Sequence, residues 1–252
     1  MNETPKGKQA YEALLKRNYL LAQPHKSFNK LFGIGANKTG STSLKLVFSI
    51  LGLRAANQNS GELTTQQLAK GNFAPLIKYV EQYDAFQDTP FAAKSYYAQL
   101  DALFPNSKFI LTIREPEAWF DSFLRHNLKQ LDLDADKTTI TAEDLVGKDY
   151  LYHGFRQLKF ESDWLLSVDQ NYTVEKCWDL SFDKNHFIDL YLQRNKEIVR
   201  HFSERPDDLL VIDITKEPTT EKIVNFLNLP EALITDMPHL NQNLVFPQKD
   251  SA

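Results

Sequence analysis

The chain has 252 residues, of which 42% are hydrophobic and 25% charged, with a formal net charge of −4 and a pI near 5.9. This length suits one large α/β domain, and the acidic balance argues against a general nucleic-acid binder, which would carry a basic excess. Cys177 is the only cysteine, and no apolar run reaches the length of a signal peptide or a membrane span. We therefore expect a single domain over residues 1–252 that is cytoplasmic and has no membrane span.

Hydrophobic periodicity and turn residues predict alternating helices and strands. The N-terminal segment 1–27 contains an amphipathic helix at 8–22, and one face of it, which we expect to pack on the domain, carries Tyr11, Leu14, Leu15, Asn18 and Leu21. The pattern then predicts, in chain order, strand 31–35, helix 42–52, strand 53–57, helices 62–69 and 73–81, strand 83–88, helix 91–103, strand 108–115, helix 116–130, helix 183–203, strand 207–214 and helix 218–228. Residues 131–148 are polar and irregular, with a start at 141–144 (TAED) that resembles a capping box. This alternation predicts a three-layer α/β fold with a central parallel sheet flanked by helices.

A glycine-bearing loop, GIGANKTGSTSL at 33–44, joins the first strand to its helix. In a nucleoside-triphosphatase loop the lysine directly follows the last glycine, whereas here Lys38 precedes Gly40 by two residues. Backbone N–H groups at the start of the helix suit phosphate or sulfate oxygens, and hydroxyl donors are added by Thr39, Ser41, Thr42 and Ser43. The alternative is an ordinary glycine-containing turn that caps a helix.

Two further features lie at predicted strand ends, where open parallel sheets bind ligands. Arg114 ends the strand at 108–115, and Ser122 lies about two turns into the next helix, so both could reach one anion. Asp88 ends the strand at 83–88 and could act as a general base. The alternatives are a surface arginine with an exposed helical serine, and an aspartate that forms a turn or helix cap.

Together these residues resemble the cytosolic-type sulfotransferases that use 3′-phosphoadenosine 5′-phosphosulfate (PAPS). NKTGSTS resembles that family's 5′-phosphosulfate loop, typically PKSGTTW, in which lysine also precedes a small residue and glycine. KFILTIREPEAWFDSF resembles the 3′-phosphate segment, where serine follows the strand-end arginine after eight residues. DTP at 88–90 stands where many relatives have a His-Leu-Pro base. A weaker likeness to a bacterial-type branch continues in LLVIDI, NFLNLP and MPHLN.

The resemblance implies a P-loop-like sulfotransferase fold and transfer of the sulfuryl group of PAPS, leaving PAP, to a hydroxyl or less favourably an amine. It makes Lys38 and Asp88 the catalytic residues, Lys38 as the cation on the leaving oxygen and Asp88 as the base. Arg114 and Ser122 would hold the 3′-phosphate. The full set that would bind the donor is Lys38, Thr39, Gly40, Ser41, Thr42, Ser43, Arg114 and Ser122. This scheme needs no metal, and no cluster in the sequence has convincing ligand spacing.

Three departures from the family pattern leave parts of the site open. Asn37 replaces the loop proline, and Ser43 stands where many relatives have a tryptophan that packs on the adenine. Phe86, two residues before Asp88, occupies a position where some relatives keep a lysine. Three other residues therefore remain candidates for the general base, namely His126, His153 and Glu161.

Residues 131–180 are expected to cover the acceptor, which would be a small molecule, sugar or lipid. Aromatic side chains that could line an acceptor site, or could equally be core, are Tyr150, Tyr152, Phe155, Phe160 and Trp164.

A first rival function is a P-loop kinase or nucleotidase, with Asp213 as its metal-holding aspartate. A second is a non-catalytic domain that binds PAP or a nucleotide and regulates a partner; the presence of Lys38 and Asp88 favours an enzyme.

Overall fold

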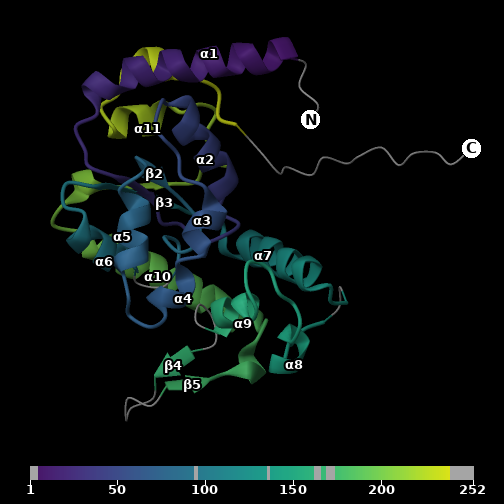
Figure 1. Ribbon diagram of the computed structural model, residues 1–252. Helices are drawn as coiled ribbons and strands as arrows, with labels where there is room; N and C mark the ends of the chain where they lie inside the picture. The colour runs from purple at the N-terminus through teal and green to yellow at the C-terminus, as the bar shows by residue number, and fades with distance from the viewer. Residues whose placement is uncertain (1–4, 94–95, 135–136, 162–165, 169–173, 239–252) are drawn as a thin grey trace, which may run out of the picture.

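The structure, a computed structural model, describes residues 5–93, 96–134, 137–161, 166–168 and 174–238 (Figure 1). Its central sheet has four parallel strands in the order β2-β1-β3-β6. The strands are β1 (Leu31–Gly33), β2 (Ala85–Phe86), β3 (Lys108–Thr112) and β6 (Leu209–Ile212). Register places Phe32 beside Phe86 and Phe109. Successive side chains of a strand point to opposite faces, so the sheet supplies two separate cores.

Helices cover both faces of this sheet, which confirms the expected three-layer α/β architecture. The first face packs Leu31 and Ile110 against α1 (Pro5–Ala22), α2 (Ser41–Ile50) and α11 (Glu221–Phe226). The second face packs Phe32 and Phe109 against a larger set, α4 (Thr65–Leu68), α5 (Ala74–Val80), α6 (Tyr96–Leu103) and α10 (Lys184–His201). A short helix, α3 (Gln58–Glu62), lies against α5.

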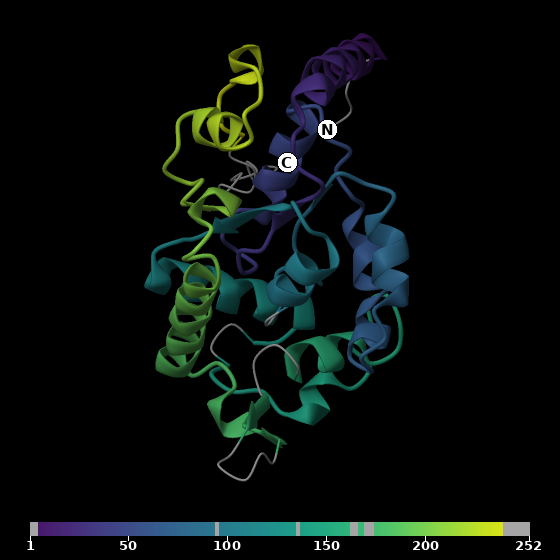
Figure 2. The same cartoon turned by 90° about the vertical axis from the view of Figure 1, so that its left-hand side faces the viewer.

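A third apolar cluster lies below the sheet and joins the middle of the chain to α10. It is formed mainly by α7 (Pro116–Leu131), α8 (Ala142–Leu145), α9 (Phe155–Phe160) and the first half of α10. Beyond it a small antiparallel sheet pairs β4 (Leu166–Val168) with β5 (Val174–Lys176). Figures 1 and 2 show this sheet at one end of the molecule and α1 and α11 at the other. Short 3-10 turns complete the fold, namely η1 (Gln23–His25), η3 (Trp178–Leu180), η4 (Pro206–Asp208) and η5 (Glu231–Leu233).

The end of α2 shows how the sequence sets an element boundary. Gly52 has φ +78°, and the N–H of Leu53 donates to the carbonyl of Phe48 at 3.0 Å, which is the Schellman pattern. A Cβ on Gly52 would lie 2.3 Å from the carbonyl oxygen of Asn18, so α1 can approach α2 closely only at a glycine. The Asn18 side chain completes this contact by donating to the carbonyl of Ile50 at 2.7 Å.

Several predicted elements differ from those found. Residues 53–57 form no strand and contribute only an isolated bridge between Ala55 and Ala85. Of the helix expected at 62–69, only the four residues of α4 are helical beyond Glu62, and α3 precedes them. The small sheet of β4 and β5 was not predicted. On α1, Tyr11 and Leu14 are exposed, so only the last turns of the expected apolar face pack on the domain. No helix in the described part of the chain is long and apolar enough to cross a membrane.

Candidate active site

The site lies at the carboxyl ends of the parallel strands, beside the point where the strand order reverses. The chain passes from β1 to β2 on one side and continues through β3 to β6 on the other. The connections that leave β1 and β3 therefore diverge, which is where open α/β sheets leave a crevice for a ligand. The loop at 34–40 follows β1, and Arg114 follows β3.

The backbone of the loop is held in a conformation that suits glycine. Gly40 has φ +100°, and a Cβ there would lie 2.5 Å from Ile214, so a larger residue would clash as well as strain the turn. Gly40 is also the N-cap of α2. The N–H groups of Ser41 and Thr42 thus occupy the first two helical positions, where a backbone N–H has no acceptor within the helix. The sequence interpretation of this loop as an anion-binding helix start agrees with this geometry.

Three side chains that the sequence analysis did not single out brace the loop. Trp119 of α7 donates from Nε1 to the carbonyl of Asn37 at 2.9 Å. Tyr191 of α10 stacks on Trp119, with ring centroids 4.2 Å apart, and its hydroxyl contacts both the N–H and the carbonyl of Arg114. Arg194 donates to the carbonyl of Ile34 at 2.9 Å. These contacts join segments about 75 to 160 residues apart, so no local sequence pattern indicates them.

A polar pocket of about 970 Å³ opens over this loop. It brings together Lys38, Gly40, Ser41 and Thr42 of the loop, Asp88 after β2, and Arg114 and Ser122 of the predicted 3′-phosphate segment. Arg114 also donates from Nη1 to the carbonyl of Lys38 at 3.4 Å, which ties the two anion-binding segments together. The expectation that Arg114 and Ser122 could face one ligand is compatible with this arrangement.

Two loop residues of the expected donor site do not line the pocket. Thr39 is fully buried, and its hydroxyl donates to the carbonyl of Ala36 at 2.6 Å and contacts the Thr112 hydroxyl at 2.6 Å. Ser43 is also buried. The Thr39 hydroxyl therefore stabilises the loop. The prediction that this hydroxyl donates to the ligand is wrong.

Asp88 is held in place by the residues around it. The Ser41 hydroxyl donates to Oδ2 at 3.1 Å, and the N–H of Thr89 donates to Oδ1 at 2.8 Å. Asp88 has φ +63°, a conformation that Asp tolerates better than most residues. Both contacts use only part of the capacity of a carboxylate, which has about four lone-pair positions. The side chain can therefore still accept a proton or a hydrogen bond from a molecule in the pocket.

The electrostatic environment of the pocket is cationic. Burial lowers the pKa of Lys38, and the nearby charges of Arg114 and Arg125 lower it further, against the opposing effect of Asp88. His126 also lines the pocket, and burial together with the charge of Lys38 lowers its pKa to about 4. His126 is therefore a neutral imidazole near pH 7, which can bind a hydrogen-bonding ligand but is a weak base.

The other candidate bases and the candidate metal ligand lie elsewhere. His153 is exposed and contacts Asp149 at 3.1 Å, and Glu161 accepts a hydrogen bond from Gln157; neither lines the pocket. Asp213 also lies outside the pocket wall, where its carboxylate accepts from the Thr215 hydroxyl at 2.6 Å and pairs with Lys216. These contacts give Asp213 a structural role in the turn after β6.

The region expected to cover the acceptor contributes part of the wall. Tyr150, Phe155 and Phe160 line the pocket, whereas Tyr152 does not, and Trp164 lies outside the described residues. Phe86 is buried among aromatic rings of the second core, so the position two residues before Asp88 supplies no cation. The sequence analysis missed Gln58 and Glu62 of α3, which also line the pocket. A lone glutamate on a short helix carries no sequence signal that could have identified it.

Comparison with known proteins identifies the family of the chain. A search of curated proteins returned no match. The family model described as a sulfotransferase domain matches residues 30–246, which includes the loop, β2, the Arg114 segment and the strand at β6. The chain therefore belongs to the sulfotransferase-domain family.

Proposed function

We propose that the protein transfers a sulfuryl group from PAPS to a hydroxyl of a small-molecule, sugar or lipid acceptor. The observation that carries this proposal is the pocket itself, which gathers Lys38, Asp88, Arg114 and Ser122 from three separate segments of the sequence. Membership in the sulfotransferase-domain family supports the reaction type. The identity of the donor is inferred from the loop and the Arg114 segment.

The residues present fit such a donor. The N–H groups of Ser41 and Thr42 at the start of α2, together with the Thr42 hydroxyl, suit the 5′-phosphate, whereas the Ser41 hydroxyl already donates to Asp88. Arg114 and Ser122 suit the 3′-phosphate, since a guanidinium can bind phosphate oxygens in pairs. When bound, PAPS supplies an activated sulfuryl group.

Two side chains then act on the reaction. Lys38 places a positive charge where negative charge develops on the leaving oxygen, an electrostatic effect that is strong in a half-buried site. Asp88 accepts the proton of the acceptor hydroxyl, and its contacts with Ser41 and Thr89 fix the direction of the carboxylate. His126 lies in the same pocket as a neutral group that can orient the acceptor.

Calorimetric titration with PAP, compared with ADP plus Mg²⁺, tests the proposal. We expect micromolar binding of PAP that depends on its 3′-phosphate and weakens in Arg114→Ala by about 10-fold or more, as for loss of a charge-assisted contact. A preference for ADP–Mg²⁺ would instead support the kinase or nucleotidase alternative. PAP binding without any transfer across a broad acceptor screen would favour the non-catalytic alternative.

A further inference from the structure

The pocket has two ends that differ in what they offer a ligand. One end is formed by the loop, Arg114 and Ser122, where the donor is proposed to bind. The other end is formed by α3 and α9, with the last turns of α7 beside them. Gln130 of α7 contacts Arg156 of α9 and lies eight residues beyond Ser122, which is about 12 Å along a helix. The α3–α9 end is therefore separate from the 3′-phosphate end, and the acceptor is the molecule left to fill it.

A buried carboxylate with an unused oxygen marks this end. Glu62 is only 4% exposed yet lines the pocket. Its Oε1 accepts from Nε2 of Gln58 at 3.1 Å, whereas no group among the described residues donates to Oε2. Burial raises the pKa of Glu62, and the charge of Asp88 adds to this effect. A buried oxygen of this kind is costly unless a partner satisfies it, so a ligand that donates a hydrogen bond would relieve the cost.

Cations on α9 lie beside this carboxylate. Arg156 and Lys159 both line the pocket, and their charges lower the pKa of both Glu62 and His126. Arg156 lies over the Tyr150 ring at 5.4 Å and makes long contacts of 3.4 Å with Gln130. No carboxylate in the described ranges pairs with Arg156, so its guanidinium keeps donors for an anion.

The net charge of the pocket wall restricts the charge that the acceptor can carry. The wall carries two carboxylates, Glu62 and Asp88, and six cations, namely Lys38, Arg114, Arg125, Lys129, Arg156 and Lys159. Lys38 and Arg114 are assigned to the donor, and the four cations that remain still outnumber Glu62 and Asp88. This excess attracts anions and repels a protonated amine, even though Glu62 alone would attract one. A hydroxyl donates to Glu62 without adding positive charge.

We propose that the α3–α9 end binds an acceptor that carries both hydroxyl groups and an anionic group, of which a sugar acid is a simple example. Glu62 accepts a hydrogen bond from a hydroxyl of this acceptor, and Arg156 with Lys159 pairs with its anionic group. This inference rests on the proposed function, because it assigns the donor to the opposite end of the same pocket.

Three probes of one ring size test this class by calorimetry on PAP-loaded protein: glucuronate, glucose and protonated glucosamine. We expect glucuronate to bind roughly 10-fold more tightly than glucose, and glucosamine to bind most weakly. The double variant Arg156→Gln, Lys159→Gln should remove the advantage of glucuronate over glucose. Glu62→Gln should weaken glucuronate and glucose alike, by about 5- to 10-fold. Lys148→Gln, a nearby lysine outside the pocket wall, is the matched control and should change neither affinity.

The outcomes separate this inference from the function on which it rests. PAP affinity is measured first for every variant, and an unchanged value shows that the fold and the donor end are intact. Failure of the unaltered protein to bind PAP would overturn the proposed function. With PAP bound, tightest binding of glucosamine, equal binding of all three probes, or binding of none would overturn the proposed acceptor class.

Discussion

Lys38 is the residue on which the proposed chemistry depends most. Its side chain is half-buried, and burial together with the charges of Arg114 and Arg125 lowers its pKa. The charged ammonium is thus under-stabilised in the free protein, and a bound anion would stabilise it. We expect Lys38→Ala to reduce turnover by about 10²- to 10³-fold, the range for removal of one electrostatic stabiliser. The measurement is transfer from labelled PAPS to an acceptor found by screening. Lys45→Ala, on α2 but outside the pocket, should retain activity, and a Lys38→Ala enzyme of full turnover would remove Lys38 from the mechanism.

Asp88 is tested by a substitution that preserves its shape. Asp88→Asn keeps one oxygen that can accept from Ser41 or Thr89 but cannot take a proton from the acceptor. We expect a loss of turnover of about 10²- to 10⁴-fold, as for removal of a general base, with PAP affinity changed little. Steady-state kinetics and PAP titration on the same preparation distinguish these effects. Full turnover in Asp88→Asn would exclude Asp88 as the base and leave Glu62 and His126 of the pocket wall as the candidates.

His126 reports the charge of the pocket. In the free protein its pKa is lowered to about 4 by burial and by the charge of Lys38. An anion bound at Lys38 compensates that charge, so PAP should raise the pKa of His126, and Lys38→Ala should raise it without any ligand. NMR titration of the imidazole resonances, assigned with His126→Gln, measures both changes. The resonances of His153, which lies outside the pocket, should not respond to PAP.

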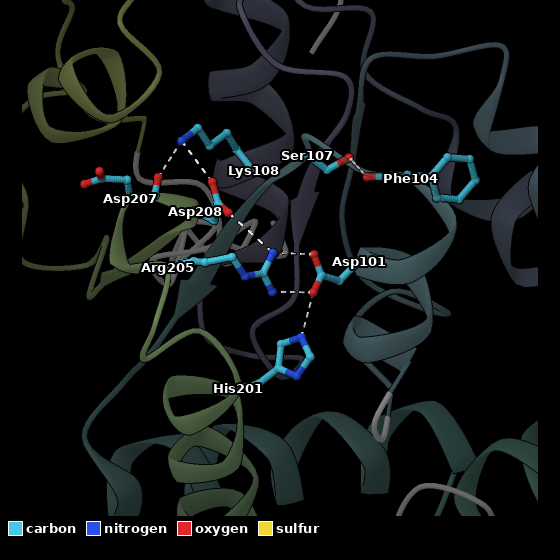
Figure 3. A network of polar contacts seen from close by, with 8 residues as sticks. All are labelled: Asp101, Phe104, Ser107, Lys108, His201, Arg205, Asp207 and Asp208. Atoms are coloured by element: carbon cyan, nitrogen blue, oxygen red, sulfur yellow. Dashed lines mark hydrogen bonds and ion pairs between the residues drawn. The ribbon is translucent and has the colours of Figure 1, made fainter.

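At the scale of elements, a polar network fastens α6 to the end of α10 and to β3 (Figure 3). The carboxylate of Asp101 in α6 accepts from Nη1 and Nη2 of Arg205, at 3.0 and 2.6 Å, and contacts Nε2 of His201 at 2.8 Å. Arg205 also approaches Asp208, which pairs with Lys108 at the start of β3. Only the centre of this network is well covered by neighbouring residues, since the Asp101 side chain is 16% exposed whereas that of Arg205 is 46% exposed.

Substitution of Asp101 tests the contribution of this network to stability. Hydrogen bonds from Arg205, and then from His201, lower the pKa of Asp101 in the folded protein, although burial opposes them. The carboxylate therefore stabilises the fold above the unfolded pKa of about 3.9, and this contribution is lost as the pH falls through the lower folded value. We expect Asp101→Asn to lower the free energy of unfolding by about 1–3 kcal/mol near neutral pH. Urea titrations over a pH series measure it; the difference should shrink below about pH 4, and the exposed Glu204→Gln should show none.

The elements also show what could be predicted from sequence. Long amphipathic helices such as α7 and α10, and the apolar strand β3, were predicted close to their observed bounds because local periodicity and caps define them. The capping box at Thr141 and the glycine stop at Gly52 were confirmed for the same reason. Short elements were predicted less well: α3 and α4 are single turns, and β4 and β5 pair only with each other. Their boundaries depend on tertiary packing, which has no periodic signal in a few residues.

The same distinction applies to the candidate site. Lys38, Asp88 and Arg114 were expected at one site because each follows a strand, and parallel strands bring their ends together; Ser122 was added because of its spacing from Arg114. Glu62 and Arg156 were missed, since the α3–α9 wall forms only when segments about 95 residues apart meet. The Thr39 hydroxyl was assigned to the ligand because sequence alone does not show that Thr112 lies 2.6 Å away.

At the scale of the whole molecule, net charge and local charge have opposite signs. The chain carries a formal charge of −4, and PAP is itself an anion, so the net charges would repel each other. The pocket wall nevertheless has six cations and two carboxylates. Fields at a binding site are dominated by charges within about one Debye length, which is about 8 Å at physiological ionic strength. Local attraction should therefore outweigh the repulsion of the whole chain.

The salt dependence of PAP affinity tests whether local attraction in the pocket or repulsion by the net charge of the chain governs donor binding. Added salt screens attraction to the pocket more than it relieves distant repulsion, so we expect the PAP dissociation constant to rise steadily as NaCl increases from low salt to about 0.5 M. Calorimetric titration over this range measures the slope, with sulfate-free buffers so that no competing anion occupies the loop. Arg114→Ala should flatten the slope because it removes one of the attracting charges, whereas Lys222→Ala, outside the pocket wall, should leave it unchanged. Affinity that improves with salt would mean that repulsion between the net charges controls binding, and the cationic pocket would then lose its role as the donor site.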